Sequence, residues 1–311
     1  MRHLFRLPSF LVLVILGAAL TAFAAQSVDP ADLVKQGQKL LAEGKHDAAL
    51  ELFRQALQRS PDLYDAHLNA GVALDLTGHY TEARRHFEKA IQIAPEDRKN
   101  QALANMGVSY AFEGNAKSAS TFYRQAFDRQ MTAGPDLAGA PETANALGRV
   151  YLECGDLDNA FKWYQTGYET SRRQPKLPAD QVDLWDLRWA HAQARMAARK
   201  GNAAEARKQM AIVKALVDKG TNPDQQIQYP YLAGYVSFYL KDYTGAIAEL
   251  QKADPSDPFI QLLLAQAYEK SRDAANAREA YTQALASNAH SLNNAFARPL
   301  ARKKVAGGQR Q

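Results

Sequence analysis

The chain has 311 residues, of which 46% are apolar and 23% charged, and this apolar share excludes a mostly disordered chain. The formal net charge is +5, but five of the 38 basic residues stand in the last fourteen positions, which contain no acid. The body of the chain is therefore nearly neutral. We expect no nucleic-acid partner, because a protein of that class carries its basic surface on the folded body.

The first 24 residues have the pattern of a secretory signal peptide. Arg2 and Arg6 give a basic start, residues 10–20 are apolar, and a small-x-small sequence predicts cleavage after Ala24. We therefore expect a periplasmic or secreted protein. The alternative is a retained N-terminal anchor, which would tether the chain to a membrane. The apolar run is short for that role, because a spanning helix needs about 20 residues.

One pattern of small and aromatic residues then recurs four times, with a period of about 34 residues in the first two copies. Each copy has two glycines seven residues apart, then an alanine, an aromatic residue and another small residue at fixed offsets. The copies read Gly37, Gly44, Ala49, Phe53 and Ala56; Gly71, Gly78, Ala83, Phe87 and Ala90; Gly107, Gly114, Ala119, Tyr123 and Ala126; Gly148, Gly155, Ala160, Tyr164 and Gly167.

These offsets predict a pair of helices in each copy. The first glycine lets two helices approach closely, and the aromatic side chain fills the space between them. The second glycine provides the positive φ that closes the first helix, and Pro61 and Pro95 stop the second helix of their copies. One pair cannot bury its apolar face alone, so neighbouring pairs must stack.

The C-terminal half carries a weaker form of the pattern. Residues 180–200 read as one long helix that follows a proline-rich loop, and residues 201–219 complete a fifth pair. A sixth pair surrounds Gly234 and a seventh surrounds Ala265. The seventh has Arg272 where the turn glycine is expected, which puts its turn geometry in doubt but not the pair itself.

The pattern resembles the tetratricopeptide repeat (TPR) over about residues 29–291. The resemblance implies an all-α, right-handed α-solenoid of about seven helix–turn–helix repeats, with about fourteen helices and no sheet. The predicted divisions are a signal peptide (1–24), repeats 1–3 (25–133), repeat 4 (134–174), degenerate repeats 5–7 (175–291) and a basic C-terminal cap or tail (292–311).

The resemblance also implies a concave groove, lined by the first helix of each repeat, that binds a peptide or a partner helix. Asn69 and Asn105 occupy equivalent positions, and their amides could form a ladder that pairs with an extended backbone. The alternative is that they bond within their own helical layer. By helical spacing, the partner-binding groove would comprise Asn69, Asn105, Asp65, Val72, Gln101, Val108, Glu142 and Arg149.

Two aromatic residues on the long helix, Trp185 and Trp189, lie one helical turn apart. We expect them to close the apolar seam between repeats 4 and 5. The alternative is an exposed aromatic patch for a partner.

Nothing in the sequence indicates catalysis. The histidines are scattered, no zinc-ligand spacing or nucleophile motif occurs, and the single cysteine, Cys154, reads as a small half-buried helix residue. We expect no metal or cofactor. The chain is thus predicted to be a non-catalytic protein–protein interaction scaffold. The alternatives are an accessory subunit of an envelope enzyme or assembly complex, and the membrane-tethered scaffold.

Overall fold

The computed structural model describes residues 28–134 and 137–307, so the predicted signal peptide lies outside the described residues. This part of the chain contains α-helices and two short 3-10 helices, and no strand. The helices are α1 (Pro30–Ala42), α2 (His46–Arg59), α3 (Tyr64–Thr77), α4 (Tyr80–Ile93), α5 (Lys99–Phe112), α6 (Ala116–Thr132), α7 (Ala140–Glu153), α8 (Leu157–Ser171), α9 (Ala179–Arg199), α10 (Ala203–Lys219), α11 (Gln228–Tyr239), α12 (Tyr243–Leu250), α13 (Pro258–Lys270), α14 (Ala274–Ala284) and α15 (Leu292–Gly307).

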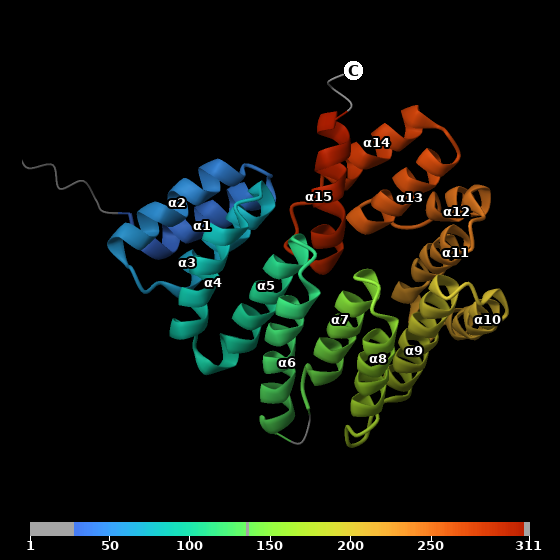
Figure 1. Cartoon of the computed structure of the whole chain (residues 1–311). Coiled ribbons are helices and arrows are strands. Elements are labelled where there is room, and N and C mark those ends of the chain that lie inside the picture. Colours follow the sequence, from blue (N-terminus) through green and yellow to red (C-terminus); the bar gives the residue numbers. More distant parts are fainter. Residues whose placement is uncertain (1–27, 135–136, 308–311) are drawn as a thin grey trace, which may run out of the picture.

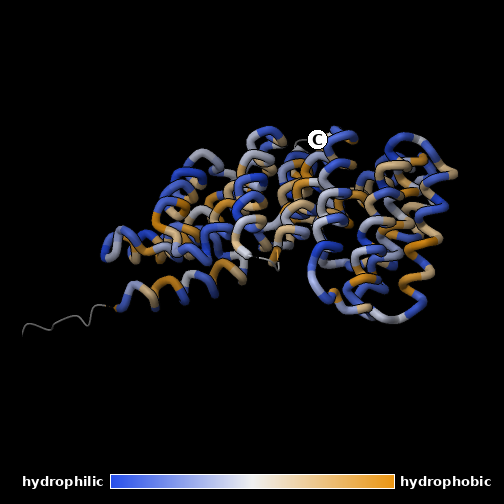
Figure 2. The backbone as a smooth tube through the Cα atoms, turned by 90° about the horizontal axis from the view of Figure 1, so that it is seen from below, coloured by the Kyte–Doolittle hydropathy of each residue, from blue (hydrophilic) through white to orange (hydrophobic). Residues whose placement is uncertain are grey.

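Consecutive helices form seven hairpins, from α1–α2 to α13–α14, and each hairpin packs on the next (Figure 1). The predicted all-α stack of seven helix pairs is therefore confirmed. In Figure 2 apolar and polar residues are interspersed along the helices. Within the described ranges, no helix is both long and apolar enough to cross a membrane.

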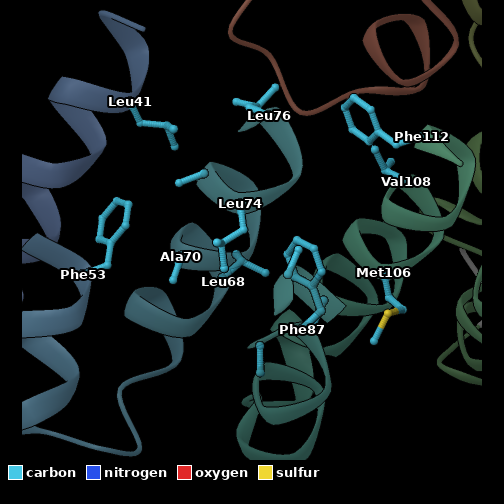
Figure 3. Close-up of a cluster of buried hydrophobic side chains, with 14 of the residues drawn as sticks. Leu41, Phe53, Leu68, Ala70, Leu74, Leu76, Phe87, Met106, Val108 and Phe112 are labelled. Atoms are coloured by element: carbon cyan, nitrogen blue, oxygen red, sulfur yellow. The ribbon is translucent and has the colours of Figure 1, made fainter. Parts of the chain in front are cut away.

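Each of the first four hairpins is closed by a glycine against an aromatic ring. A Cβ atom built on Gly71 would lie 2.6 Å from the ring of Phe87, and one on Gly148 would lie 2.8 Å from the ring of Tyr164. Phe87 is fully buried in the apolar cluster that spans the first three hairpins (Figure 3). Only glycine permits this approach, as the repeat pattern predicts.

The turn between the paired helices has the same backbone in every hairpin. Gly78 ends α3 with a φ of +92° and a left-handed conformation. In the last two hairpins Lys241 and Arg272 stand at the equivalent position and also have positive φ, of +68° and +62°. The missing glycine therefore leaves the turn geometry unchanged.

Trp189, the second residue of the tryptophan pair, lies at the seam between the fourth and fifth hairpins. Trp185 is buried, and Trp189 stacks on Tyr168 at 5.8 Å and packs against Phe161 at 5.4 Å, both on α8. The expected role in closing that seam agrees with this placement.

The last helix returns to the first half of the chain. It packs on α13 and α14, as the next member of the stack would, and also on α5 (Figure 1). Phe296 contacts the apolar clusters of both ends of the chain. The described part of the predicted basic cap is thus a helix that is covered on both sides, and its contacts close the stack into a ring between the second and third hairpins and the last one.

Candidate functional site: the inner surface

The inner surface is formed by the first helices of the hairpins. At its N-terminal end, the carboxylate of Asp65 on α3 accepts two bonds from Arg98, at 2.8 and 3.0 Å. The Arg98 guanidinium lies over the ring of Tyr64 at 4.3 Å and donates to Gln101 at 3.2 Å. The hydrogen bond to Asp65 raises the pKa of Arg98. The structure thus brings together the predicted groove residues Asp65 and Gln101.

The two equivalent asparagines are half-buried on successive first helices. The side-chain amide of Asn69 donates to the carbonyl oxygen of Asp65 at 2.7 Å, and that of Asn105 donates to the carbonyl oxygen of Gln101 at 2.8 Å. Each asparagine therefore bonds the preceding turn of its own helix. An amide has a second proton and an acceptor oxygen, so this bond leaves capacity for an incoming backbone, and the ladder stays a prediction.

A hollow of about 240 Å³ lies between α1 and α3. Its lining combines apolar, amide, basic and acidic side chains, and it includes Asp65. The lining residues are Ala31, Val34, Lys35, Gln38, Leu63 and Asp65.

Two predicted groove residues are less accessible than expected, because they pack in or against the apolar cluster that also contains Ala295 of α15. Val108 is only 6% exposed and belongs to the same apolar cluster as Ala295 of α15. Val72 is half-buried against that cluster. Figure 3 shows Val108 and Phe112 beneath the C-terminal part of the chain. Val108 is therefore core in this structure and does not line an accessible groove.

The last two predicted groove residues, Glu142 and Arg149, lie in different environments. Glu142 is exposed at the start of α7, 3.5 Å from Arg188. Arg149 is withdrawn from solvent and lies 3.0 Å from Glu153, with its guanidinium over the ring of Phe259 on α13 at 4.5 Å. The prediction that Arg149 lines an accessible groove is wrong, because α13 places Phe259 against its guanidinium group.

Arg149 is part of a buried polar cluster that the sequence analysis did not identify. Arg199 forms an ion pair with Glu153 and donates to the hydroxyl of Tyr235 at 2.6 Å. Arg195 donates to the hydroxyl of Tyr164 at 3.0 Å. The rings of Tyr235 and Tyr164 also face these guanidinium groups, and such contacts partly replace lost hydration.

Burial has the expected electrostatic effect in this cluster. Desolvation holds the pKa of His191 well below 6.5 and raises the pKa of Tyr235 well above its ordinary value. The cluster had a sequence signal, because Arg149 follows the small Gly148 and Arg195 follows Ala194 at the same step of two successive repeats. Repeat alignment places both side chains on the inner surface; Arg195 is enclosed by Tyr164 and Tyr235 of the adjacent hairpins, and Arg149 also meets Phe259 on α13.

Between residues 28 and 307, apart from 135–136, no three metal-ligating side chains of the His, Cys, Asp or Glu type gather. Cys154 is exposed at the C-terminal end of α7 rather than half-buried, because it caps the helix at the surface.

Family models for the tetratricopeptide repeat match residues 40–106, and also residues 141–173 and 260–290. The chain is 26% identical over 256 residues to cellulose synthase 1 operon protein C of Komagataeibacter xylinus, which covers 80% of this chain and 18% of that protein. It is 31% identical over 128 residues to the CTR9 homolog of Arabidopsis thaliana, covering 41% of this chain and 11% of that protein. The chain thus spans only a small part of these two relatives.

A third relative is the photosystem I assembly protein Ycf3 of Parasynechococcus marenigrum, 26% identical over 129 residues, with 40% of this chain and 73% of that protein covered. Among solved structures, a tetratricopeptide repeat protein from Parabacteroides merdae superposes with a TM-score of 0.54 at 14% identity, over 89% of this chain and 97% of that one. The type IV pilus biogenesis factor PilW superposes with a TM-score of 0.50 at 12% identity, over 80% and 97%. These structures share the fold.

Proposed function

This chain is a tetratricopeptide repeat protein, and its repeats indicate a protein–protein interaction scaffold; from that premise we propose that it binds a peptide or helix of a partner on the inner surface of α1, α3 and α5. Proteins of this fold are typically non-catalytic, and we propose the same here. The repeats therefore hold a partner rather than transform it.

The observation that carries the proposal is the hollow between α1 and α3, together with the two equivalent asparagines that follow it on α3 and α5. The hollow contains Asp65, whose helix also carries Asn69, and the amide of Asn105 lies one repeat further on. An extended backbone needs regularly spaced donors and acceptors, and two equivalent amides on stacked helices provide them.

We also propose that the protein acts in the periplasm or outside the cell. The support is the basic, apolar and small-x-small order of residues 2–24. N-terminal sequencing of the protein from cells tests this: a start at Ala25 or its neighbour indicates export with cleavage. An intact Met1 in the membrane fraction indicates the tethered scaffold instead.

A second candidate is an accessory subunit of an assembly complex in the envelope. It is favoured by the names of two similar proteins, an assembly protein for photosystem I and a pilus biogenesis factor. Co-purification of the protein with several subunits of one envelope complex supports this candidate, whereas a single partner supports the simple scaffold.

The test of inner-surface binding is the double variant Asn69→Asp/Asn105→Asp. Each amide donor becomes a charged acceptor, which repels the carbonyl groups of a bound backbone. Loss of a hydrogen bond from the amide to that backbone costs about 1–3 kcal/mol when the contact is buried. Affinity capture from the fraction that contains the protein should recover about tenfold less partner with little change in melting temperature.

The matched control is Gln92→Glu/Gln283→Glu, two exposed amides that lie on second helices of their hairpins. It makes the same change of charge and should recover the partner as the wild type does. If the asparagine variant lowers the melting temperature as much as it lowers recovery, the asparagines are structural and inner-surface binding loses its support.

A further inference from the structure

The end of α3 is capped by two arginines from the far end of the chain. Arg302 donates to the carbonyl oxygens of Leu76 and Thr77, at 2.7 and 3.1 Å, and Arg298 donates to that of Leu76 at 3.0 Å. The last carbonyl groups of a helix lack partners within the helix and carry partial negative charge. Two guanidinium groups one helical turn apart on α15 therefore match this end of α3.

A row of hydrogen-bonded side chains joins the loop before α15 to α3 and α5, the first helices of the second and third hairpins. The Nε2 atom of His290 lies 2.8 Å from a carboxylate oxygen of Asp75 on α3, and the hydroxyl of Ser109 on α5 donates to the other oxygen at 2.9 Å. Burial raises the pKa of Asp75. Both carboxylate oxygens of Asp75 thus have a side-chain partner, one of them from the loop before α15.

The apolar part of the same contact involves Leu292, Ala295 and Phe296 of α15. The His290 ring adds to it and lies 5.5 Å from Phe87 and 5.7 Å from Phe112. The apolar surface that α15 covers here is formed by residues of α3 and α5, including Val108. Polar contacts to side chains and main-chain carbonyls therefore supply the specificity of the closure.

The closing helix is weak in itself. Pro299 stands inside α15, where it cannot donate to the carbonyl of Ala295 and disfavours a regular helix. The helix also carries no acidic residue, so its basic side chains have no partner along α15. Its order depends on the surfaces on either side of it.

We propose that α15 and the loop before it are a displaceable internal ligand of the inner surface at α3 and α5. The partner that replaces it is a helical segment with the same chemistry: two guanidinium groups one turn apart, beside an aromatic and a small residue. This inference deepens the proposed function and rests on it. The chemistry of the partner helix is inferred from α15 itself. The arginines of α15 bind the carbonyl groups at the end of α3, and its Phe296 packs against the apolar cluster of α3 and α5.

The first test compares Arg302→Gln with Lys303→Gln by hydrogen–deuterium exchange of the full chain. Arg302 contacts α3, whereas Lys303 is exposed on the same helix, so the two variants lose the same charge. Arg302→Gln should raise exchange in residues 292–307 and at the end of α3 by about tenfold, because a charge-assisted hydrogen bond is lost. Exchange in α9 and α10 should stay as in the wild type.

Lys303→Gln should exchange like the wild type throughout. The proposal is overturned if both variants behave alike, if Arg302→Gln raises exchange evenly over all helices, or if that variant fails to fold. Each of these results would make α15 an ordinary member of the core.

The second test uses a labelled synthetic peptide of residues 288–307 and fluorescence anisotropy. The peptide should bind the full-length Arg302→Gln variant about tenfold more tightly than the wild type or Lys303→Gln, since the internal competitor is weakened. Lack of binding to the variant overturns the displaceable ligand. A concentration-dependent dimer of the variant without peptide assigns the surface to a second copy of the chain and overturns the partner helix.

The peptide test needs no natural partner, so it separates the proposal of a displaceable α15 from the proposal of a partner-binding scaffold. Peptide binding without any recovered cellular partner leaves α15 displaceable and removes support for the scaffold. Recovery of a partner that does not compete with the peptide retains the scaffold and rejects this site.

Discussion

At the scale of single residues, the turn between paired helices requires one residue in the left-handed conformation. Glycine occupies that position in the first five hairpins, at no steric cost. Lys241 and Arg272 adopt the same conformation in the last two, although a side chain makes it less favourable by roughly 1–2 kcal/mol. Packing of the hairpins therefore holds Lys241 and Arg272 in a left-handed conformation that such residues rarely adopt.

Replacing Arg272 with glycine should stabilise the protein. The relief of the left-handed strain exceeds the extra entropy of an unfolded glycine, and we expect a gain of about 0.5–1 kcal/mol, seen as a higher melting temperature. Arg278→Gly is the control, because this exposed residue lies inside α14, and glycine there should cost about 1 kcal/mol. A lower melting temperature for Arg272→Gly would show that its side chain, not its backbone, matters.

The close approach at Gly71 gives the opposite expectation. A methyl group there would meet the buried Phe87 ring at 2.6 Å, so Gly71→Ala should lower stability by about 1–3 kcal/mol even though alanine is the better helix former. Denaturant unfolding measures the change. Gly307→Ala is the control, with no atom within 4 Å of the new group; equal stability of both variants would contradict the packing described here.

At the scale of helices, each hairpin is held by contacts between its own two members, and some of these are sensitive to pH. His67 on α3 and His86 on α4 face each other with their Nδ1 atoms 3.1 Å apart. One nitrogen must donate and the other accept, so the contact requires a neutral ring. Burial lowers the pKa of both histidines below 6.5.

This pair should make the protein less stable in acid. Since the pKa of each histidine is lower in the folded than in the unfolded state, the unfolded chain binds more protons below about pH 6.5, and stability falls as the pH drops through that value. Melting temperatures between about pH 7.5 and 5 should decline less steeply for His86→Gln than for the wild type. His79→Gln, at an exposed turn position, should keep the wild-type slope.

An unchanged slope in His86→Gln would show that the pair does not govern the acid response. The other histidines whose pKa is lowered, His46 and His191, act in the same direction and contribute to the slope that remains.

At the scale of the whole molecule, closure of the ring decides which part of the inner surface is accessible. The end formed by α1 and α3 retains a hollow, whereas α15 covers Val108 and α13 lies across Arg149. Neighbouring hairpins also enclose Arg149 and Arg199 around Glu153, and Arg195 between Tyr164 and Tyr235. A solenoid that remained open would lose the contacts of α15 with α5 and of Phe259 with Arg149, and would leave Val108 and Arg149 more accessible.

The sequence by itself determined the helix pairs, because the offsets from Gly71 to Phe87 and to the turn at Gly78 recur and each has a local physical cause. The groove itself is implied by the resemblance to the repeat family, and helical spacing only predicts that Asp65, Asn69, Gln101 and Asn105 share that face. Only the tertiary structure decided which inner residues stay accessible. Contacts such as Arg302 with Thr77 join segments more than 200 residues apart in the sequence, and the small rotation between repeats that brings them together adds up over the whole stack. A local sequence pattern does not predict this accumulated rotation.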